Sequence, residues 1–328
     1  MNILVTHLIQ LFFVLATSLF ANPATHPDSL KHEPIAQSVL DLQQTVRHYN
    51  SLYKHPCIPF EWNGSIEKCQ AGVVPNQILM IVQKRINFFR AVNGLGPITI
   101  NPNFNVSAQE AALMMASNGK LSHHPDESWT CFSELGAHGA EASNLTLGNY
   151  KLLDPNSLII GFIWDYGTPN YFVGHRRWLL YSRLSEIGFG LTSSSEAVNV
   201  GDGVLTKAPL HLPDFIAYPW NGYVPADLIF PKWSFSIPEG NNVDFSNCRI
   251  EMIDWTGEEI GIKTFPEKKM LDPTITWEAS GLFAPYEIKY GQNSLKEKGY
   301  VGKSIQVKIS NVNVDGKLRN YHYQVTVI

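Results

Sequence analysis

The run Gly174–Tyr181 combines, within a short stretch, the side chains in this chain that are best suited to chemistry. It holds an imidazole at His175, a guanidinium pair at Arg176 and Arg177, and an apolar end over 178–181. An imidazole can transfer protons or bind a metal near neutral pH. The glycine before it lets backbone approach closely and frees the ring to face a cavity. The apolar end is β-prone, so we expect a buried strand that fixes His175 at its start.

A pair of further imidazoles, His123 and His124, follows a segment with helical periodicity. Pro125 disfavours a helical conformation at the residue before it. The pair is therefore expected just outside the helix, where it can line a cleft. The alternative for His175 is a core histidine whose hydrogen bonds are satisfied. The sequence contains no Gly-x-Ser-x-Gly elbow, no His-Glu-x-x-His zinc helix and no glycine-rich phosphate loop.

Hydrophobic periodicity predicts the elements that must position these histidines. Asn76 is expected to cap the first firm helix, and Gly119 to end the second. Asp154 and Pro155 are typical of the start of a third helix. The predicted elements are helices over 75–93, 103–118 and 154–165, a loop over 126–149, and strands over 187–191 and 198–205.

The character of the sequence changes near Ala217, after which no helical periodicity is found. Short β-prone runs alternate with turn residues, at 233–235, 248–253, 260–264, 274–277, 286–290, 305–312 and 321–327. Such spacing of strands is typical of an immunoglobulin-like β-sandwich.

Composition and charge limit the classes of function. Of 328 residues, 44% are hydrophobic and 16% are charged, which indicates a folded globule. The net charge is −4 and no basic stripe is present, so nucleic acid is not an expected partner. An apolar run over 8–20 is too short to span a bilayer and is typical of a secretory signal, with cleavage expected after Ala21. We therefore expect an exported protein, extracellular or periplasmic, that is not an integral membrane protein.

Four cysteines, Cys57, Cys69, Cys131 and Cys248, suggest disulfides in an exported chain. Three connectivities are possible, and Cys57–Cys69 closes the shortest loop and is the easiest to form. An N-terminal helix is also expected around residues 35–46. The predicted organisation is a signal peptide over 1–21, an N-terminal arm and stapled loop over 22–74, a first folded domain over 75–215, and the β-sandwich over 216–328.

Three motifs, in the same order, resemble the CAP superfamily of cysteine-rich secretory, antigen 5 and pathogenesis-related 1 proteins, in its bacterial extracellular form. They are Ile86–Arg90 with Gly94-Leu95, Ala108–Ala112 through Asn118–His123, and Gly174–Trp178 with Ile187–Gly190. The resemblance covers residues 75–205 and implies an α-β-α sandwich with a central cleft. With the sandwich that follows, the expected fold class is α+β.

The resemblance also implies a site, because two histidines and two acidic residues usually line the family's cleft and can hold a divalent metal. By motif, His123 and His175 correspond to the histidines, and Asp165 is the nearest match to the third position. The fourth position is open. Ser143 replaces the glutamate if the register is kept, and Glu141 supplies it if the loop shifts. Such a set suits Zn²⁺ with an open water position, which could support hydrolysis.

Three functions follow from this reading. The first is binding of an extracellular ligand or protein in the cleft, with or without a divalent metal, and an aromatic rim would suit a lipid or sterol. The second is hydrolysis, metal-assisted or protease-like, with His123 and His175 as base and orienter. The third is a non-catalytic structural or adhesion module, in which the two histidines and Asp165 form a hydrogen-bonded polar cluster.

The ligand-cleft residues expected besides the metal set are Ser143, Asn144, Arg176 and Trp178. Of the two arginines, one is expected to form an ion pair with Asp165 or Glu186, and the other could meet an anionic ligand.

Overall fold

The computed structural model describes residues 40–56, 58, 60–150, 157–238, 242–284, 287 and 295–328, which belong to one compact unit. The predicted signal peptide lies outside these residues. Among the described helices, none is long and apolar enough to cross a membrane. The predicted N-terminal helix is described only in its second half, as α1 (Leu42–His48), which continues into a π-helical turn, Tyr49–Tyr53.

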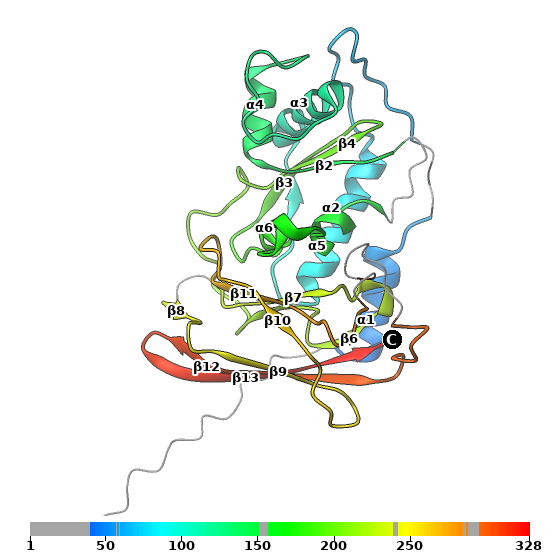
Figure 1. The fold of residues 1–328 in the computed structure, drawn as a ribbon. Helices are drawn as coiled ribbons and strands as arrows, with labels where there is room; N and C mark the ends of the chain where they lie inside the picture. Colours follow the sequence, from blue (N-terminus) through cyan, green and yellow to red (C-terminus); the bar gives the residue numbers. More distant parts are fainter. Residues whose placement is uncertain are drawn as a thin grey trace, which may run out of the picture. The chain divides into compact units, whose positions relative to one another are not determined.

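The N-terminal part is built on a four-stranded sheet in the order β1-β3-β4-β2. Its strands are β1 (Thr99–Ile100), β2 (Ser143–Leu147), β3 (Glu186–Leu191) and β4 (Ser195–Asn199). The helices are α2 (Asn76–Ala91), α3 (Pro102–Asn118), α4 (Glu134–Glu141), α5 (Ile160–Trp164) and α6 (Gly174–Leu179). Figure 1 shows α3 and α4 on one side of the sheet and α2, α5 and α6 on the other. The α-β-α sandwich is therefore present.

Helix α3 lies almost directly on strand β3 because both contact faces carry small residues. Ala108 is fully buried on the helix. A Cβ atom added at Gly190 would collide with the backbone of Ala108, and one added at Gly188 would collide with Phe104. The glycines that alternate along β3 thus permit a helix–sheet approach that no other residue allows.

The boundaries of the two long helices agree with the sequence prediction, but one cap does not. Asn101 caps α3 by accepting a hydrogen bond from the N–H of Asn103 (3.0 Å), and Gly119 ends it in the left-handed conformation with φ of 59°. The predicted cap of α2 is wrong. Asn76 is its first helical residue, and Pro75 occupies the cap position without a side-chain hydrogen bond.

Three further predictions are corrected by the structure. The expected loop over 126–149 contains α4 and β2, whose short periodic stretches are too brief to stand out in the sequence. The expected strand over 178–181 is instead the last two residues of helix α6 and the turn that follows. An apolar run of that length fits a buried helix as well as a strand, and its neighbours decide which forms. The strand expected over 198–205 begins and ends earlier, as β4. The start of the third helix, 151–156, lies outside the described residues.

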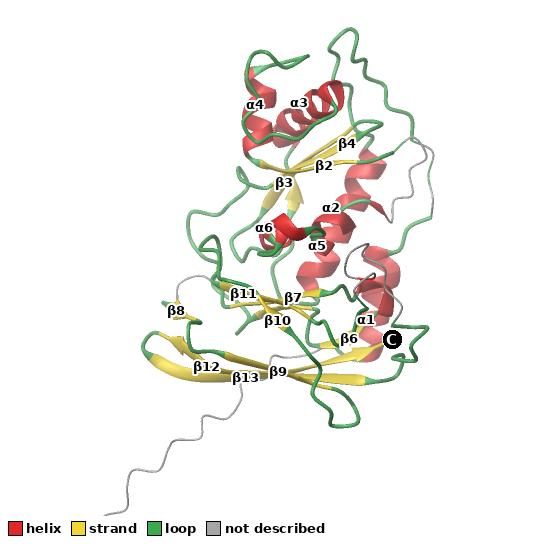
Figure 2. Ribbon diagram, in the orientation of Figure 1, coloured by secondary structure: helices red, strands yellow, loops and turns green. Residues whose placement is uncertain are grey.

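The C-terminal part is a β-sandwich of two sheets, which Figure 2 shows as stacked layers of strands. One sheet has the order β10-β11-β7-β5, and the other β6-β13-β12-β8, with β9 also paired to β12. The strands are β5 (Ile216–Tyr218), β6 (Gly222–Val224), β7 (Lys232–Ser236), β8 (Val243–Asp244), β9 (Arg249–Ile253), β10 (Lys263–Thr264), β11 (Thr274–Glu278), β12 (Ser304–Val314) and β13 (Lys317–Val327).

The sandwich core forms where alternate residues of the two sheets meet. Phe235 of β7 and Tyr321 of β13 pack with ring centroids 5.0 Å apart, and Phe215 contacts both rings. Six of the predicted strands overlap observed ones. The seventh, 286–290, lies outside the described residues except for residue 287, which is not in a strand. Strands β5, β6 and β8 are too short to show a period-two pattern, and the sequence does not predict them.

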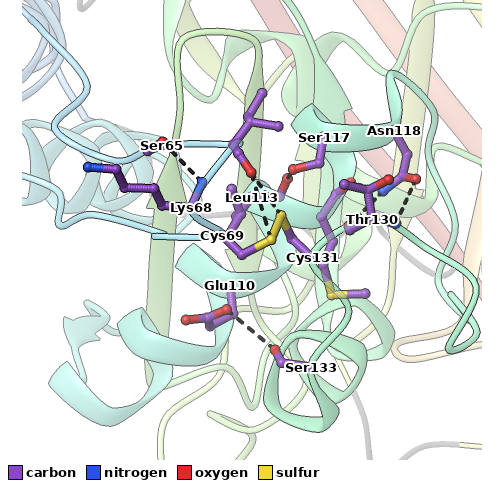
Figure 3. The surroundings of a disulfide bond; sticks show 12 residues. Ser65, Lys68, Cys69, Glu110, Leu113, Ser117, Asn118, Thr130, Cys131 and Ser133 are labelled. Carbon is purple, nitrogen blue, oxygen red and sulfur yellow. Dashed lines mark hydrogen bonds between the residues drawn. A yellow bond between two sulfur atoms is a disulfide. The ribbon is translucent and has the colours of Figure 1, made fainter.

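A disulfide joins Cys69 to Cys131, across 62 positions, with the two Cα atoms 5.1 Å apart. Figure 3 shows it beside Leu113 and Ser117 of α3. The predicted pairing of Cys57 with Cys69 is therefore wrong. The shorter loop is entropically easier to close, but tertiary packing brings Cys131 to Cys69. Cys248 is a free, half-buried thiol.

A buried carboxylate in the sheet predicts a measurable pH effect on stability. Glu196 of β4 accepts hydrogen bonds from the Tyr150 hydroxyl and the Ile159 N–H, both at 3.2 Å. Burial raises its pKa from 4.5 to about 7. Because the folded state holds the proton more tightly, its stability falls as pH rises from the unfolded-state pKa through the folded one.

The free energy of unfolding of wild type should therefore fall by about 3 kcal/mol over this pH range. The variant Glu196→Gln should not show this fall. Urea unfolding at about pH 5 and about pH 8 measures it. The exposed residue Glu258 offers a control, Glu258→Gln, which should keep the wild-type pH profile. Parallel profiles for wild type and Glu196→Gln would contradict the assignment.

Candidate functional site

The two histidines, 52 positions apart in the sequence (175 − 123), line the same hollow. This histidine hollow has a volume of about 720 Å³. Its lining includes His123, His138, Glu141, Ser143, Asn144, Phe172, His175, Trp178, Asp202, Lys268 and Met270. A neighbouring hollow of about 530 Å³ is also lined by both histidines, with Leu145, Phe162 and Trp164 among its other walls. The imidazoles thus stand where two hollows adjoin.

His175 is oriented by a buried carboxylate. Its Nδ1 lies 2.8 Å from Asp165 Oδ1, and the other oxygen, Oδ2, accepts the Arg176 N–H at 3.2 Å. The Asp165 side chain has no exposed surface, whereas that of His175 is 25% exposed. Asp165 ends α5 with φ of 56°, a left-handed conformation that aspartate tolerates better than most residues. This turn aims the carboxylate at the first turn of α6.

His123 is held from the opposite side of the hollow by the backbone of α4. Its Nδ1 lies 2.9 Å from the carbonyl oxygen of Ala140. A carbonyl and a carboxylate can only accept, so both histidines carry a proton on Nδ1. In the neutral rings, each Nε2 therefore keeps a lone pair that can accept a hydrogen bond, take up a proton or bind a metal.

Strand β2 supplies two further residues of the hollow. Ser143 is 4% exposed, and its hydroxyl has no hydrogen-bond partner among the described residues. Asn144 donates from Nδ2 to the His175 carbonyl at 3.1 Å, which ties β2 to α6. A buried hydroxyl without a partner is uncommon, because its desolvation is uncompensated. Because the Ser143 Oγ has almost no accessible surface, a ligand atom would pair with it only after the side chain rotates toward the hollow.

The arginine pair does not face the hollow. Arg176 is buried and donates to the Ile163 carbonyl at 2.6 Å and to Ser234 Oγ at 3.2 Å, with its guanidinium over the Tyr218 ring. Arg177 donates to the carbonyls of Lys268, Met270 and Asp272. Arg176 therefore does not line the hollow. Within the part of the chain that the structure describes, neither arginine side chain forms an ion pair. Both join the α-β-α layers to the sandwich.

Burial lowers the pKa of both arginines to about 10, so both stay charged at neutral pH. Arg177 has a consequence for the site, because it fixes the segment between β10 and β11. Lys268 and Met270 of that segment line the histidine hollow. Residues of the predicted sandwich region thus contribute to the cleft, and no local sequence signal announces this.

His138 and Asp202 are two more residues that sequence reasoning did not assign to the site. Nε2 of His138 lies 2.9 Å from Asp202 Oδ2 at the edge of the hollow. The sequence predicts His138 as a loop residue, whereas it lies on α4. Recognising that α4 is a helix would have placed His138 one turn before Glu141, on the same face.

The comparisons with known proteins add a family. Residues 83–202 match the family model described as the cysteine-rich secretory protein family, CAP. This part of the chain is a CAP domain. His123 and His175 lie within the matched residues. The α-β-α sandwich begins before them, because α2 starts at Asn76.

Two solved structures also show similarity. CopC from Methylosinus trichosporium OB3b is 22% identical over 34% of this chain and 87% of its own, with a TM-score of 0.23. An extracellular SCP-domain protein from Bacillus anthracis str. Ames is 16% identical, with a TM-score of 0.29. That match covers 38% of this chain and 39% of the Bacillus protein. No match was found among curated proteins.

The CAP-domain residues fit a metal only in part. The two Nε2 lone pairs are suitable donors, but both oxygens of Asp165 accept N–H bonds from the protein. Ser143 stands where the family motif has an acidic residue in register, and Glu141 is exposed at the edge. Among the described residues, no three His, Cys, Asp or Glu side chains converge closely enough to hold an ion. This arrangement does not fit a four-ligand centre, and Zn²⁺ binding stays a prediction.

Proposed function

We propose that this CAP-domain protein binds a small hydroxylated amphipathic molecule, such as a sterol, in the histidine hollow. The observation that carries the proposal is the unpartnered hydroxyl of Ser143 in the same hollow as two imidazoles whose Nδ1 atoms are already bonded. A ligand hydroxyl can donate to an imidazole Nε2 and, once the Ser143 side chain rotates toward the hollow, accept from its hydroxyl. A buried polar group gains most from such a partner.

The remaining walls suit an apolar ligand body. Phe172, Trp178 and Met270 line the hollow and are each half-buried. A volume of about 720 Å³ lies within the range typical of small-molecule sites. The combination of an apolar wall with a few convergent polar groups favours an amphipathic ligand over a strongly charged one.

A hydrolase is the second candidate, and the Asp165–His175 pair favours it because a carboxylate orients the base in such enzymes. A nucleophile must lie within hydrogen-bond reach of that base. The Ser143 hydroxyl has no partner of this kind among the described residues. Binding without turnover is therefore the better-supported function. A hydrolase would lose turnover in a folded His175→Ala variant.

Export belongs to the same proposal. The Cys69–Cys131 disulfide is typical of an oxidising compartment outside the cytosol. The extracellular assignment printed for the Bacillus anthracis protein agrees with this location.

Cholesterol and its methyl ether provide a direct test, since the ether cannot donate a hydrogen bond. Wild type should bind cholesterol saturably and the ether about tenfold more weakly, the loss of one buried hydrogen bond. His123→Ala and Ser143→Ala should show the same reduction for cholesterol. Binding is followed by intrinsic tryptophan fluorescence, to which Trp178 contributes, with Zn²⁺ and with a chelator, so that any metal requirement is seen.

The control is His124→Ala, which removes an exposed imidazole that does not line the hollow. It should bind cholesterol as wild type does. Equal affinity for cholesterol and the ether, or full binding by Ser143→Ala, would contradict the proposed contacts.

A further inference from the structure

A second hollow of about 720 Å³ lies between the loop that follows α5 and the edge of the sheet β10-β11-β7. Four part-exposed aromatic side chains line this aromatic hollow: Trp164, Tyr166, Tyr171 and Phe265. Tyr166 is the most exposed, at 46%. The sequence gives them only as scattered aromatics, and the fold gathers them around one cavity.

The wall formed by the loop is held in place by Lys232 of β7. Its ammonium group donates to three backbone carbonyls, of Asp165 (2.9 Å), Gly167 (2.6 Å) and Asn170 (3.1 Å). An ammonium has three N–H donors, so these contacts use all of them. Lys232 thus fixes the loop that carries Tyr166 and Tyr171, and it presents no donor to a ligand.

The sheet side of the hollow carries polar groups of offsetting charge. Glu278 of β11 is the direct cross-strand partner of Lys263 on β10 and of Lys232 on β7. Directly opposed residues project from the same face of a sheet. The carboxylate therefore lies between two ammonium groups, and the Thr264 hydroxyl adjoins the same wall. A ligand meets hydrogen-bonding groups here with one net positive charge, and the Lys232 ammonium is already bonded to three carbonyls.

We propose that the aromatic hollow is a binding site for an uncharged saccharide. The C–H faces of a sugar ring pack against aromatic rings, while its hydroxyls pair with carboxylate, ammonium and hydroxyl groups. An apolar lipid would cover Glu278 and Lys263 without pairing them, which is costly. A cationic ligand would find no uncompensated negative charge, and a multiply charged anion would find one net positive charge on a wall whose Lys232 ammonium is already fully bonded. The site is distinct from the histidine hollow and does not depend on the ligand bound there.

The test uses the full chain and a linear oligosaccharide of N-acetylglucosamine, followed by calorimetry and by tryptophan fluorescence. Wild type should bind it saturably. Phe265→Ala should weaken binding by about tenfold, because stacking of the sugar ring is lost, whereas Phe265→Tyr should keep the affinity. Phe265 lines the aromatic hollow but not the histidine hollow.

Two controls separate this site from general effects. Trp255→Ala removes another exposed aromatic outside the hollow, and His124→Ala removes an exposed imidazole that lines neither the aromatic nor the histidine hollow. Both should bind the oligosaccharide as wild type does. If Phe265→Ala does not fold, Glu278→Leu provides a second test, because it removes both acceptor oxygens at similar side-chain size. Absence of saturable binding by wild type, or equal weakening by Trp255→Ala, would overturn the proposal.

Discussion

Replacement of Arg90 by methionine should lower the free energy of unfolding by about 4 kcal/mol or more. The Arg90 side chain is buried, and its guanidinium donates to four carbonyls: Gly96 (2.7 Å), Leu179 (3.1 Å), Tyr181 (2.9 Å) and Leu184 (2.8 Å). Methionine keeps most of the aliphatic volume but has no donor. Each carbonyl left buried without a partner costs about 1–3 kcal/mol.

The effect should extend to the site, because three of the four carbonyls belong to the last residue of α6 and the segment between α6 and β3. Arg90 thus fixes the end of the helix that carries His175. Burial lowers the pKa of Arg90 to about 10, so the group remains charged at neutral pH and its bonds are charge-assisted. The loss should therefore appear both in stability and in weaker binding at the histidine hollow.

Urea unfolding of Arg90→Met and of a matched control, Arg249→Met, measures the effect. Arg249 forms an ion pair with Glu251 at 3.1 Å, but its side chain is 67% exposed. The control should change stability by less than about 1 kcal/mol. Equal stability of the two variants would show that the four carbonyl bonds of Arg90 do not stabilise the fold.

Removal of the disulfide, in the double variant Cys69→Ala with Cys131→Ala, should also cost about 4 kcal/mol in the chain-entropy model. The two residues are 62 positions apart, so the bond removes much conformational freedom from the unfolded chain. Neither cysteine is buried, so the substitution itself should leave only a small cavity term. The folded structure should therefore persist with lower stability.

The control is Cys248→Ala, which removes a free thiol and closes no loop. Thermal and urea unfolding are compared with and without reductant. Wild type in reductant should approach the stability of the double variant, and Cys248→Ala should respond to reductant as wild type does. A double variant as stable as oxidised wild type would contradict the entropic effect of this bond.

The fold was predictable where local pattern and final structure agree. Helices α2 and α3 are long enough to show several turns of apolar periodicity, and Gly119 supplies a stop signal that needs no tertiary partner. Long strands such as β12 and β13 alternate clearly over most of their length, because one face is buried there. In these segments the chain's own preferences point to a single structure.

Short elements were not predictable in the same way. The run 178–181 has the composition of a strand but forms the end of α6 and the turn after it, since Arg90 and the neighbouring layers hold its carbonyls. Helix α4 and strand β2 have too few residues to show a period. Their structure depends on packing against α3 and β4, which sequence proximity does not reveal.

The sequence by itself determined the residue types of the site: an imidazole after a helix-end signal, an imidazole after a glycine, and Asp165 as an acidic candidate, with the fourth position open. Only the tertiary structure decided their roles. It turned both oxygens of Asp165 toward protein N–H groups, left the Ser143 hydroxyl without a described partner, and brought Lys268 and Met270 from distant sequence to the same hollow. Side-chain chemistry is local, whereas direction, burial and partner choice arise from contacts between segments that the chain's order keeps apart.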